Sequence, residues 1–134
     1  MENNVSEWFR LAEMDRATAH HMFYTYFPKP IEIVCFHAQQ AAEKMLKGFL
    51  ISKNRETPKI HDLQVLCEMC IELDECFTVI QKESALLTRY GVIPRYPYEV
   101  DLNDDDAKQA IEDVDKVMEF VKSYFRYEID LNKQ

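Results

Sequence analysis

The sequence predicts an all-α protein, an antiparallel up-and-down bundle of four to five helices. Only 2 of the 134 residues are glycine, which argues against a turn-rich sheet architecture. Apolar residues recur at spacings of three and four through most of the chain, the period of an amphipathic helix. Proline-containing breaks at 28–30, 57–62 and 91–97 separate these stretches. At this length we expect one domain, residues 1–134, that hides roughly two-thirds of its surface on folding.

The first predicted helix begins at Asn4 or Ser6 and runs to about Tyr26. It cannot continue further, because Pro28 and Pro30 lack the backbone N–H that a helix needs. Its expected buried stripe consists of Trp8, Leu11, Ala12, Ala19, Met22, Phe23 and Tyr26.

The second predicted helix, residues 31–53, has the strongest amphipathic pattern in the chain. Its apolar residues fall within about 140° of arc at 100° per residue. They are Ile31, Val34, Cys35, Ala38, Ala41, Ala42, Met45, Leu46 and Phe49. The other side carries a narrow polar stripe of His37, Gln40, Lys44 and Lys47.

Two shorter helices are predicted at about 62–73 and 76–90, with a soft boundary near Asp74. The last helix is expected from about 104 to 127. Asn103 can cap it, and the three following aspartates place negative charge at the positive end of the helix dipole. A capping role is favoured for these aspartates over a metal site, and no metal or other cofactor is expected.

The net charge of −8 excludes a dedicated nucleic-acid binder with a broad basic surface. We therefore expect no DNA binding, and any RNA contact must be local. The N-terminal stretch lacks the features of a signal peptide, and no run is apolar enough to span a membrane. These features predict a cytosolic protein whose four cysteines are reduced and mostly buried, including the Cys67–Cys70 CxxC pair.

Three stretches together resemble one family. FHAQQAAEKMLKGFL at 36–50, IHDL at 60–63 and RYP at 95–97 are similar, in this order and spacing, to HEPN domains. The resemblance covers about residues 6–126. It implies a four- or five-helix antiparallel bundle, usually a homodimer, commonly encoded beside a minimal nucleotidyltransferase partner. The resemblance also implies that one branch of the family is a metal-independent ribonuclease. Its motif is an arginine and a histidine separated by four to six intervening residues.

That ribonuclease motif is absent where the resemblance predicts it. Beyond Arg89, the positions that a histidine would occupy hold Pro94, Arg95 and Tyr96. Arginine cannot act as a general base near neutral pH, because its guanidinium stays protonated. Elsewhere Arg16–His21 and Arg55–His61 have the required spacing. Such matches carry little weight, because a chain with six arginines and four histidines can contain them by chance.

The candidate anion- or nucleotide-binding residues are therefore Arg89, Arg95, Tyr96, His61, Lys44 and Lys47. In RYGVIPRYPY at 89–98, guanidiniums beside aromatic rings suit phosphate and base recognition. The alternative is a stiff connection whose tyrosines pack on helix ends. For His61 the alternative is capping or packing beside Asp62, and for the two lysines it is a solvated helix face.

Phe36 and Leu50 lie outside the apolar arc of the second helix, together with Gln39 and Glu43. Large apolar residues on a polar face indicate packing against an additional element or a subunit interface. We take Phe36 as a hint of a homodimer. The sequence thus favours a nucleotide- or partner-binding module of an HEPN/nucleotidyltransferase pair of the toxin–antitoxin type, with a divergent ribonuclease toxin as the alternative.

Overall fold

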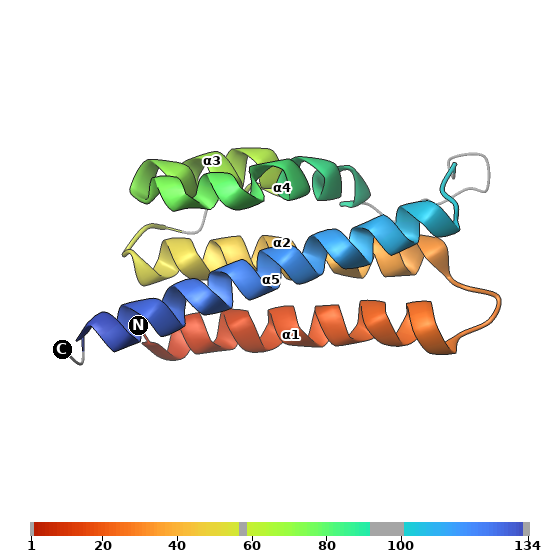
Figure 1. Ribbon diagram of the computed structural model, residues 1–134, viewed down its shortest axis with the longest axis horizontal. Helices are drawn as coiled ribbons and strands as arrows, with labels where there is room; N and C mark the ends of the chain where they lie inside the picture. The colour runs from red at the N-terminus through yellow and green to blue at the C-terminus, as the bar shows by residue number, and fades with distance from the viewer. Residues whose placement is uncertain (1, 57–58, 92–100, 133–134) are drawn as a thin grey trace.

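A computed structural model describes residues 2–56, 59–91 and 101–132, and it confirms the predicted all-α fold (Figure 1). Five α-helices are present in these ranges: α1 Glu2–Thr25, α2 Ile31–Ser52, α3 Leu63–Leu73, α4 Gln81–Leu87 and α5 Asp104–Asn132. Two 3₁₀ segments flank α4, η1 Glu75–Ile80 and η2 Thr88–Tyr90. The start of α1 and the end of α5 lie at the same end of the bundle.

The helix α2 is the centre of the fold. Its main neighbour is α1, which runs antiparallel to it, and α5 crosses it diagonally, while α3 and α4 lie over another side (Figure 1). Residues all around α2 are consequently buried. Besides the predicted apolar arc they include Gln39, Glu43, Lys47 and Leu50.

This burial corrects the predicted polar stripe of the second helix. Lys47 is only 5% exposed, so it does not belong to a solvated cationic face. The α3–α4 pair provides the additional element that Leu50 indicated, because Leu50 is fully buried and adjoins Met69 and Leu73 of α3. Phe36 is half-buried and meets the ring of His37 edge-on at 5.5 Å.

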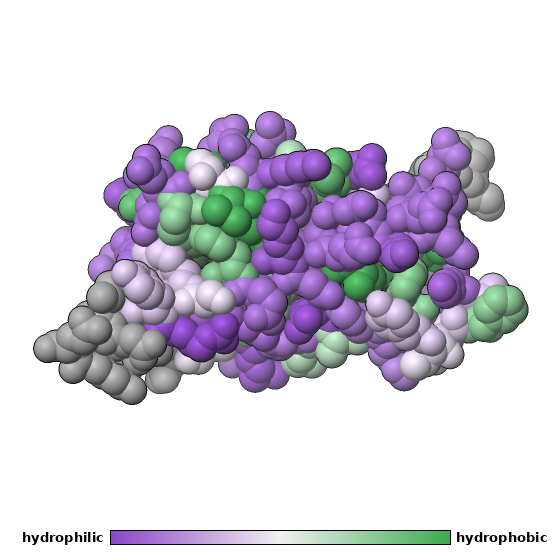
Figure 2. All heavy atoms as spheres, in the orientation of Figure 1, coloured by the Kyte–Doolittle hydropathy of each residue, from purple (hydrophilic) through white to green (hydrophobic). Residues whose placement is uncertain are grey.

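The predicted helix boundaries agree with the structure in most places. α1 ends at Thr25, so Tyr26 lies beyond the helix and is 52% exposed, which corrects its assignment to the buried stripe. The α1–α2 connection also exposes Phe27. Figure 2 shows apolar surface at the right-hand end of the molecule, where Figure 1 places this connection.

The stretch predicted as one helix at 76–90 is divided into η1, α4 and η2. Three consecutive β-branched residues, Thr78, Val79 and Ile80, disfavour a regular α-helix at the first division. Asp74 ends α3, and its side chain accepts a hydrogen bond from Cys76 N at 3.1 Å, which starts η1.

The start of α5 is capped as predicted. Asn103 Oδ1 accepts from Asp106 N, and Asp106 Oδ2 accepts from Asn103 N, each at 3.0 Å. This reciprocal pair is a capping box. The predicted apolar stripe of α5 is buried from Ala107 to Val121, while Tyr124 and Phe125 are half-buried.

An aromatic cluster holds α2, η1 and α5 together. The Phe49 ring lies 4.2 Å from that of Phe77 and 5.3 Å from that of Tyr124, measured between centroids. Phe120 adds an edge-on contact to Phe77 at 5.0 Å. Because Phe49 and Phe77 are fully buried, this cluster is a major apolar contribution to the core.

Two carboxylates are buried between α4 and α5. Asp113 is 5% exposed and accepts a hydrogen bond from Gln109 at 2.9 Å, and Glu83 pairs with Lys116 at 2.9 Å. Burial raises the pKa of Asp113. The hydrogen bond from Gln109 lowers this pKa and the nearby charge of Glu83 raises it, and the net result is a pKa above the usual value of an aspartate. A raised pKa means that the charged form of Asp113 opposes folding at neutral pH.

Asp113→Asn is therefore expected to stabilise the protein at pH 7 by about 1 kcal/mol, within the range of single stabilising substitutions. The gain should disappear as the pH falls through the raised pKa of Asp113 and below its unfolded value of 3.8, where the wild-type side chain is also neutral. Urea unfolding at pH 7 and at acid pH measures both effects. Glu119→Gln, an exposed change on the same helix, is the control and should change little.

Candidate functional site

A buried polar network occupies the side of α2 that the α3–α4 pair covers. Gln39, Glu43 and Lys47 follow one another at four-residue spacing, so they share one face of the helix. Gln39 Nε2 donates to Glu43 Oε1, and Lys47 Nζ donates to Glu43 Oε2, both at 3.1 Å. The predicted anion-binding Lys47 is thus already paired with a carboxylate inside the fold.

His61, just before α3, connects this network to the surface. Its Nδ1 lies 3.0 Å from Glu43 Oε2, and its backbone carbonyl accepts from Gln39 Nε2 at 3.3 Å. An ionised carboxylate can only accept, so Nδ1 carries the proton and Nε2 is the free nitrogen of the neutral ring. The side chain is 75% exposed, which leaves Nε2 available to a ligand.

Glu43 remains ionised in this position. Burial raises its pKa, but the hydrogen bonds from His61, Gln39 and Lys47 together outweigh that effect and hold the pKa below its usual value. A carboxylate with a lowered pKa keeps its charge at neutral pH. Glu43 can therefore orient the His61 ring by accepting a hydrogen bond from its Nδ1–H.

The first residues of α3 and the segment that follows α4 meet beside His61. Asp62 caps α3 by accepting from Gln64 N at 2.9 Å, and Thr88 Oγ1 accepts from Leu63 N at 2.9 Å. These contacts join the start of α3 to η2, where Arg89 follows Thr88. As a result His61 and Arg89, far apart in sequence, line one surface depression. Its described lining residues are His61, Asp62, Thr88, Arg89 and Gly91.

Arg89 is held at the edge of this depression without being fully neutralised. Its NH2 group donates to Tyr90 Oη at 2.7 Å, and its guanidinium carbon lies 4.9 Å from the centroid of the Tyr90 ring. In the described part of the chain its ion-pair partner is the carboxylate of Asp106, at 3.8 Å. The Arg89 side chain is 55% exposed, so its remaining N–H groups can reach a phosphate or a carboxylate.

The remaining predicted site residues lie elsewhere or outside the described residues. Lys44 pairs with Asp15 of α1, which also accepts from His37 Nδ1 at 2.9 Å. The lysine is thus engaged between α1 and α2, away from Arg89. Arg95 and Tyr96 fall in the segment 92–100, which the structure does not describe.

The chance Arg16–His21 pair does not form a site. Arg16 Nε and His20 Nε2 instead both contact Asp115 Oδ1 of α5 at 2.7 Å, whereas His21 is exposed and contacts Thr25. The Arg16–Asp115–His20 cluster joins α1 to α5. The cysteines are free, as predicted, and burial raises the pKa of the Cys67 and Cys70 thiols, which keeps both protonated near neutral pH.

Glu43, the carboxylate that Gln39, Lys47 and His61 share, was not among the predicted site residues. A signal for it was present, because Gln39, Glu43 and Lys47 are spaced for hydrogen bonding on the same face as Leu50. A polar row beside a large apolar residue is typical of a covered helix face. Within the described ranges, no group of three acidic, histidine or cysteine residues is arranged to hold a metal ion, and no helix could cross a bilayer.

The fold and this depression define a small helical-bundle protein with a histidine–arginine site where a short helix pair covers the central helix. A family model for the HEPN domain matches residues 5–124, and the chain belongs to the HEPN domain family. The crystal structure of ST0689, an archaeal HEPN homologue, is similar at 26% identity and a TM-score of 0.70, over 90% of this chain and 96% of that one.

A second crystal structure, of TT1696 from Thermus thermophilus, has the same TM-score of 0.70. It covers 90% of this chain and 98% of that one at 22% identity, which supports the fold alone. A comparison with curated proteins found no match.

Proposed function

We propose that the protein is an HEPN module that binds the phosphate of a nucleotide in the depression between His61 and Arg89. In this proposal it acts in the cytosol as a homodimer, paired with a minimal nucleotidyltransferase of the toxin–antitoxin type. The observation that carries the binding site is that these two side chains line one depression, with His61 oriented by the buried Glu43. A guanidinium and a protonated imidazole are both donors suited to phosphate oxygens.

The charges of the described residues favour binding of a single phosphate group over binding of a long polyanion. The chain carries a net charge of −8, and Asp62 and Asp106 lie beside the two cationic side chains. A nucleic-acid backbone would meet this negative surface beyond its first contacts. A nucleotide needs only the local pair, and the aromatic residues predicted for nucleotide contact in RYGVIPRYPY follow Arg89 directly in sequence.

Arg89→Gln should weaken ATP binding about tenfold, the effect of losing roughly 1.4 kcal/mol of charge-assisted hydrogen bonding. Isothermal titration with ATP, without divalent metal and at low salt, measures the change. Arg55→Gln removes an equal charge from an exposed position outside the depression and should leave the affinity unchanged. Equal affinity of Arg89→Gln and wild type would contradict this site, and equal affinity of Arg95→Ala and wild type would remove Arg95 from it.

A ribonuclease remains the second candidate function, favoured by the His61–Glu43 contact of 3.0 Å. His61 Nε2 could accept the proton of a ribose 2′-hydroxyl while Arg89 holds the adjacent phosphate. The full-length protein would then cleave single-stranded RNA in the presence of EDTA but not its 2′-deoxy equivalent. This alternative fails if RNA stays intact and expression of the protein does not slow growth.

The homodimer proposal draws support from exposed aromatic residues at the α1–α2 connection. Phe27 is 93% exposed, Tyr24 67% and Tyr26 52%. Exposed aromatic groups of this kind are typical of protein interfaces. Sedimentation of the wild type and of Phe27→Asp tests the assignment: we expect a dimer that the added charge weakens, and a monomeric wild type would contradict it.

A further inference from the structure

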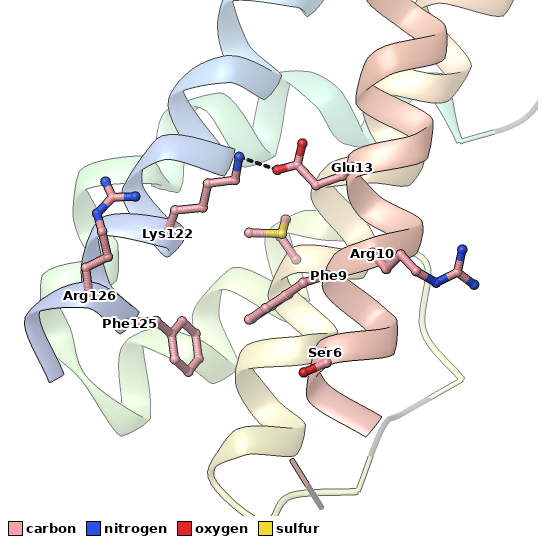
Figure 3. Close-up of a pocket in the computed structure, with 8 residues that line it drawn as sticks. Ser6, Phe9, Arg10, Glu13, Lys122, Phe125 and Arg126 are labelled. Carbon is pink, nitrogen blue, oxygen red and sulfur yellow. Dashed lines mark ion pairs between the residues drawn. The ribbon is translucent and has the colours of Figure 1, made fainter. Parts of the chain in front are cut away.

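A groove between α1 and α5 shares no residue with the His61–Arg89 depression. It lies where α1 begins and α5 ends, with α2 behind it (Figure 3). The groove encloses about 360 Å³ and is lined by Ser6, Phe9, Arg10, Glu13, Met45, Lys122, Phe125 and Arg126. This volume is in the range of small-molecule sites, about 300–1,000 Å³, and is too small for a docked helix.

The floor of the groove is apolar. The rings of Phe9 and Phe125 approach edge to face with centroids 5.1 Å apart, and Met45 of α2 lies behind them. Figure 3 shows both phenyl rings in the space between the two helices. They present a hydrophobic surface suited to a ring or a short acyl chain.

Gly48 of α2 leaves room for the Phe9 ring to pack directly against this helix. A Cβ atom at position 48 would stand 2.5 Å from Phe9 Cε1, closer than two carbon atoms can pack. Any larger residue would therefore displace the Phe9 ring from its place against α2. The shape of the groove thus depends on a glycine that does not line it.

The rim of the groove is positively charged. Among the described lining residues, Arg10, Lys122 and Arg126 contribute three cations, against the carboxylate of Glu13. Glu13 is paired with Lys122 across the groove, and Arg10 pairs with Glu7 and points away from it (Figure 3). Arg126 donates to the uncharged Ser123 Oγ at 3.0 Å on the outer side of α5, and its exposed side chain can turn toward the groove (Figure 3).

We propose that this groove binds a small hydrophobic carboxylate. The apolar body of the ligand would lie on Phe9, Phe125 and Met45. The exposed Arg126 side chain would leave Ser123 and turn toward the groove, where its guanidinium would give the carboxylate two hydrogen bonds in the fork geometry that matches a carboxylate. A nucleotide fits less well, because among the described lining residues Ser6 is the one uncharged polar side chain, and it could not satisfy the edge of a base. The inference does not rest on the proposed function of the other site.

Titration with 1-naphthoate, followed by amide chemical shifts of the full chain, tests the proposal. We expect saturable shifts at residues of the groove, weaker binding of the neutral 1-naphthalenemethanol, and about tenfold weaker naphthoate binding by Arg126→Gln. Arg55→Gln is the matched control and should bind naphthoate as the wild type does. Absence of naphthoate binding, equal binding by Arg126→Gln, or tighter binding of AMP than of naphthoate in the groove would overturn the proposal.

Gly48→Ala provides a second test that leaves every charge in place. The added methyl group should push Phe9 into the groove and reduce naphthoate affinity at least as much as Arg126→Gln does. Circular dichroism checks that the variant is folded, and ATP titration should match the wild type, since the His61–Arg89 depression is untouched. Wild-type naphthoate affinity in the folded Gly48→Ala protein would show that the ligand does not occupy this groove and would overturn the proposal.

Discussion

Phe49→Ala is expected to lower the free energy of unfolding by about 3–5 kcal/mol, the usual cost of removing a buried phenyl ring. The ring is fully buried and contacts Phe77 and Tyr124, so its loss leaves a cavity where α2, η1 and α5 meet. Domains of this kind are stable by only about 5–15 kcal/mol, so the variant would lose a large share of that stability. Urea unfolding at one fixed protein concentration measures the difference.

Tyr127→Ala also removes an aromatic ring, but one that is 64% exposed. It should alter the free energy of unfolding by less than about 0.5 kcal/mol, as exposed substitutions usually do. A comparable loss in the two variants would mean that the aromatic cluster around Phe49 does not stabilise the fold in the way its burial indicates.

The boundaries of the long helices could be predicted from local chemistry. Pro28 and Pro30 end the first helical stretch, and Asn103 begins the last, because backbone hydrogen bonding decides both. The two faces of α2 could not be predicted equally well. Its apolar arc appears in the spacing of its residues, whereas the burial of Lys47 depends on helices that arrive later in the chain.

The candidate site was only partly predictable for the same reason. His61 and Arg89 were identified by residue type, but their common depression depends on the bond from Leu63 N to Thr88 Oγ1, a tertiary contact. The contact of Glu43 with His61 likewise bridges two elements. No local pattern gives such pairings, since they follow from how helices pack and not from how each helix forms.

Glu43→Gln is expected to destabilise the protein by about 3 kcal/mol, because removing one partner leaves the other buried charge uncompensated. Lys47 is 5% exposed, and its described partner is Glu43 Oε2. Glutamine keeps the shape of the side chain, so the change mainly removes the charge. Urea unfolding at pH 7 measures the loss, and Glu68→Gln on the exposed face of α3 should change little.

The pH dependence of this loss follows from the lowered pKa of Glu43. A lowered pKa in the folded state contributes stability that is fully present above the unfolded value of 4.5 and is lost as the pH falls through the folded value. The difference between wild type and Glu43→Gln should thus be constant from pH 7 to about pH 5 and shrink at lower pH. A difference that stayed constant to pH 3 would mean that the charge of Glu43 is not what stabilises the fold.

The same substitution links stability to the proposed site. Without the carboxylate, His61 loses the charged acceptor that fixes its Nδ1 proton and the orientation of its ring. Glu43→Gln should therefore weaken ATP binding severalfold at a pH where the protein is still folded, although Glu43 is buried below the depression. Lys47→Met should also lower the free energy of unfolding, because it removes the lysine that is paired with Glu43. It leaves the contact between His61 and Glu43 in place, so the ATP affinity should equal that of the wild type. Equal losses of affinity in the two variants would indicate general loosening of the α2–α3 contact instead of a specific role for the Glu43–His61 pair.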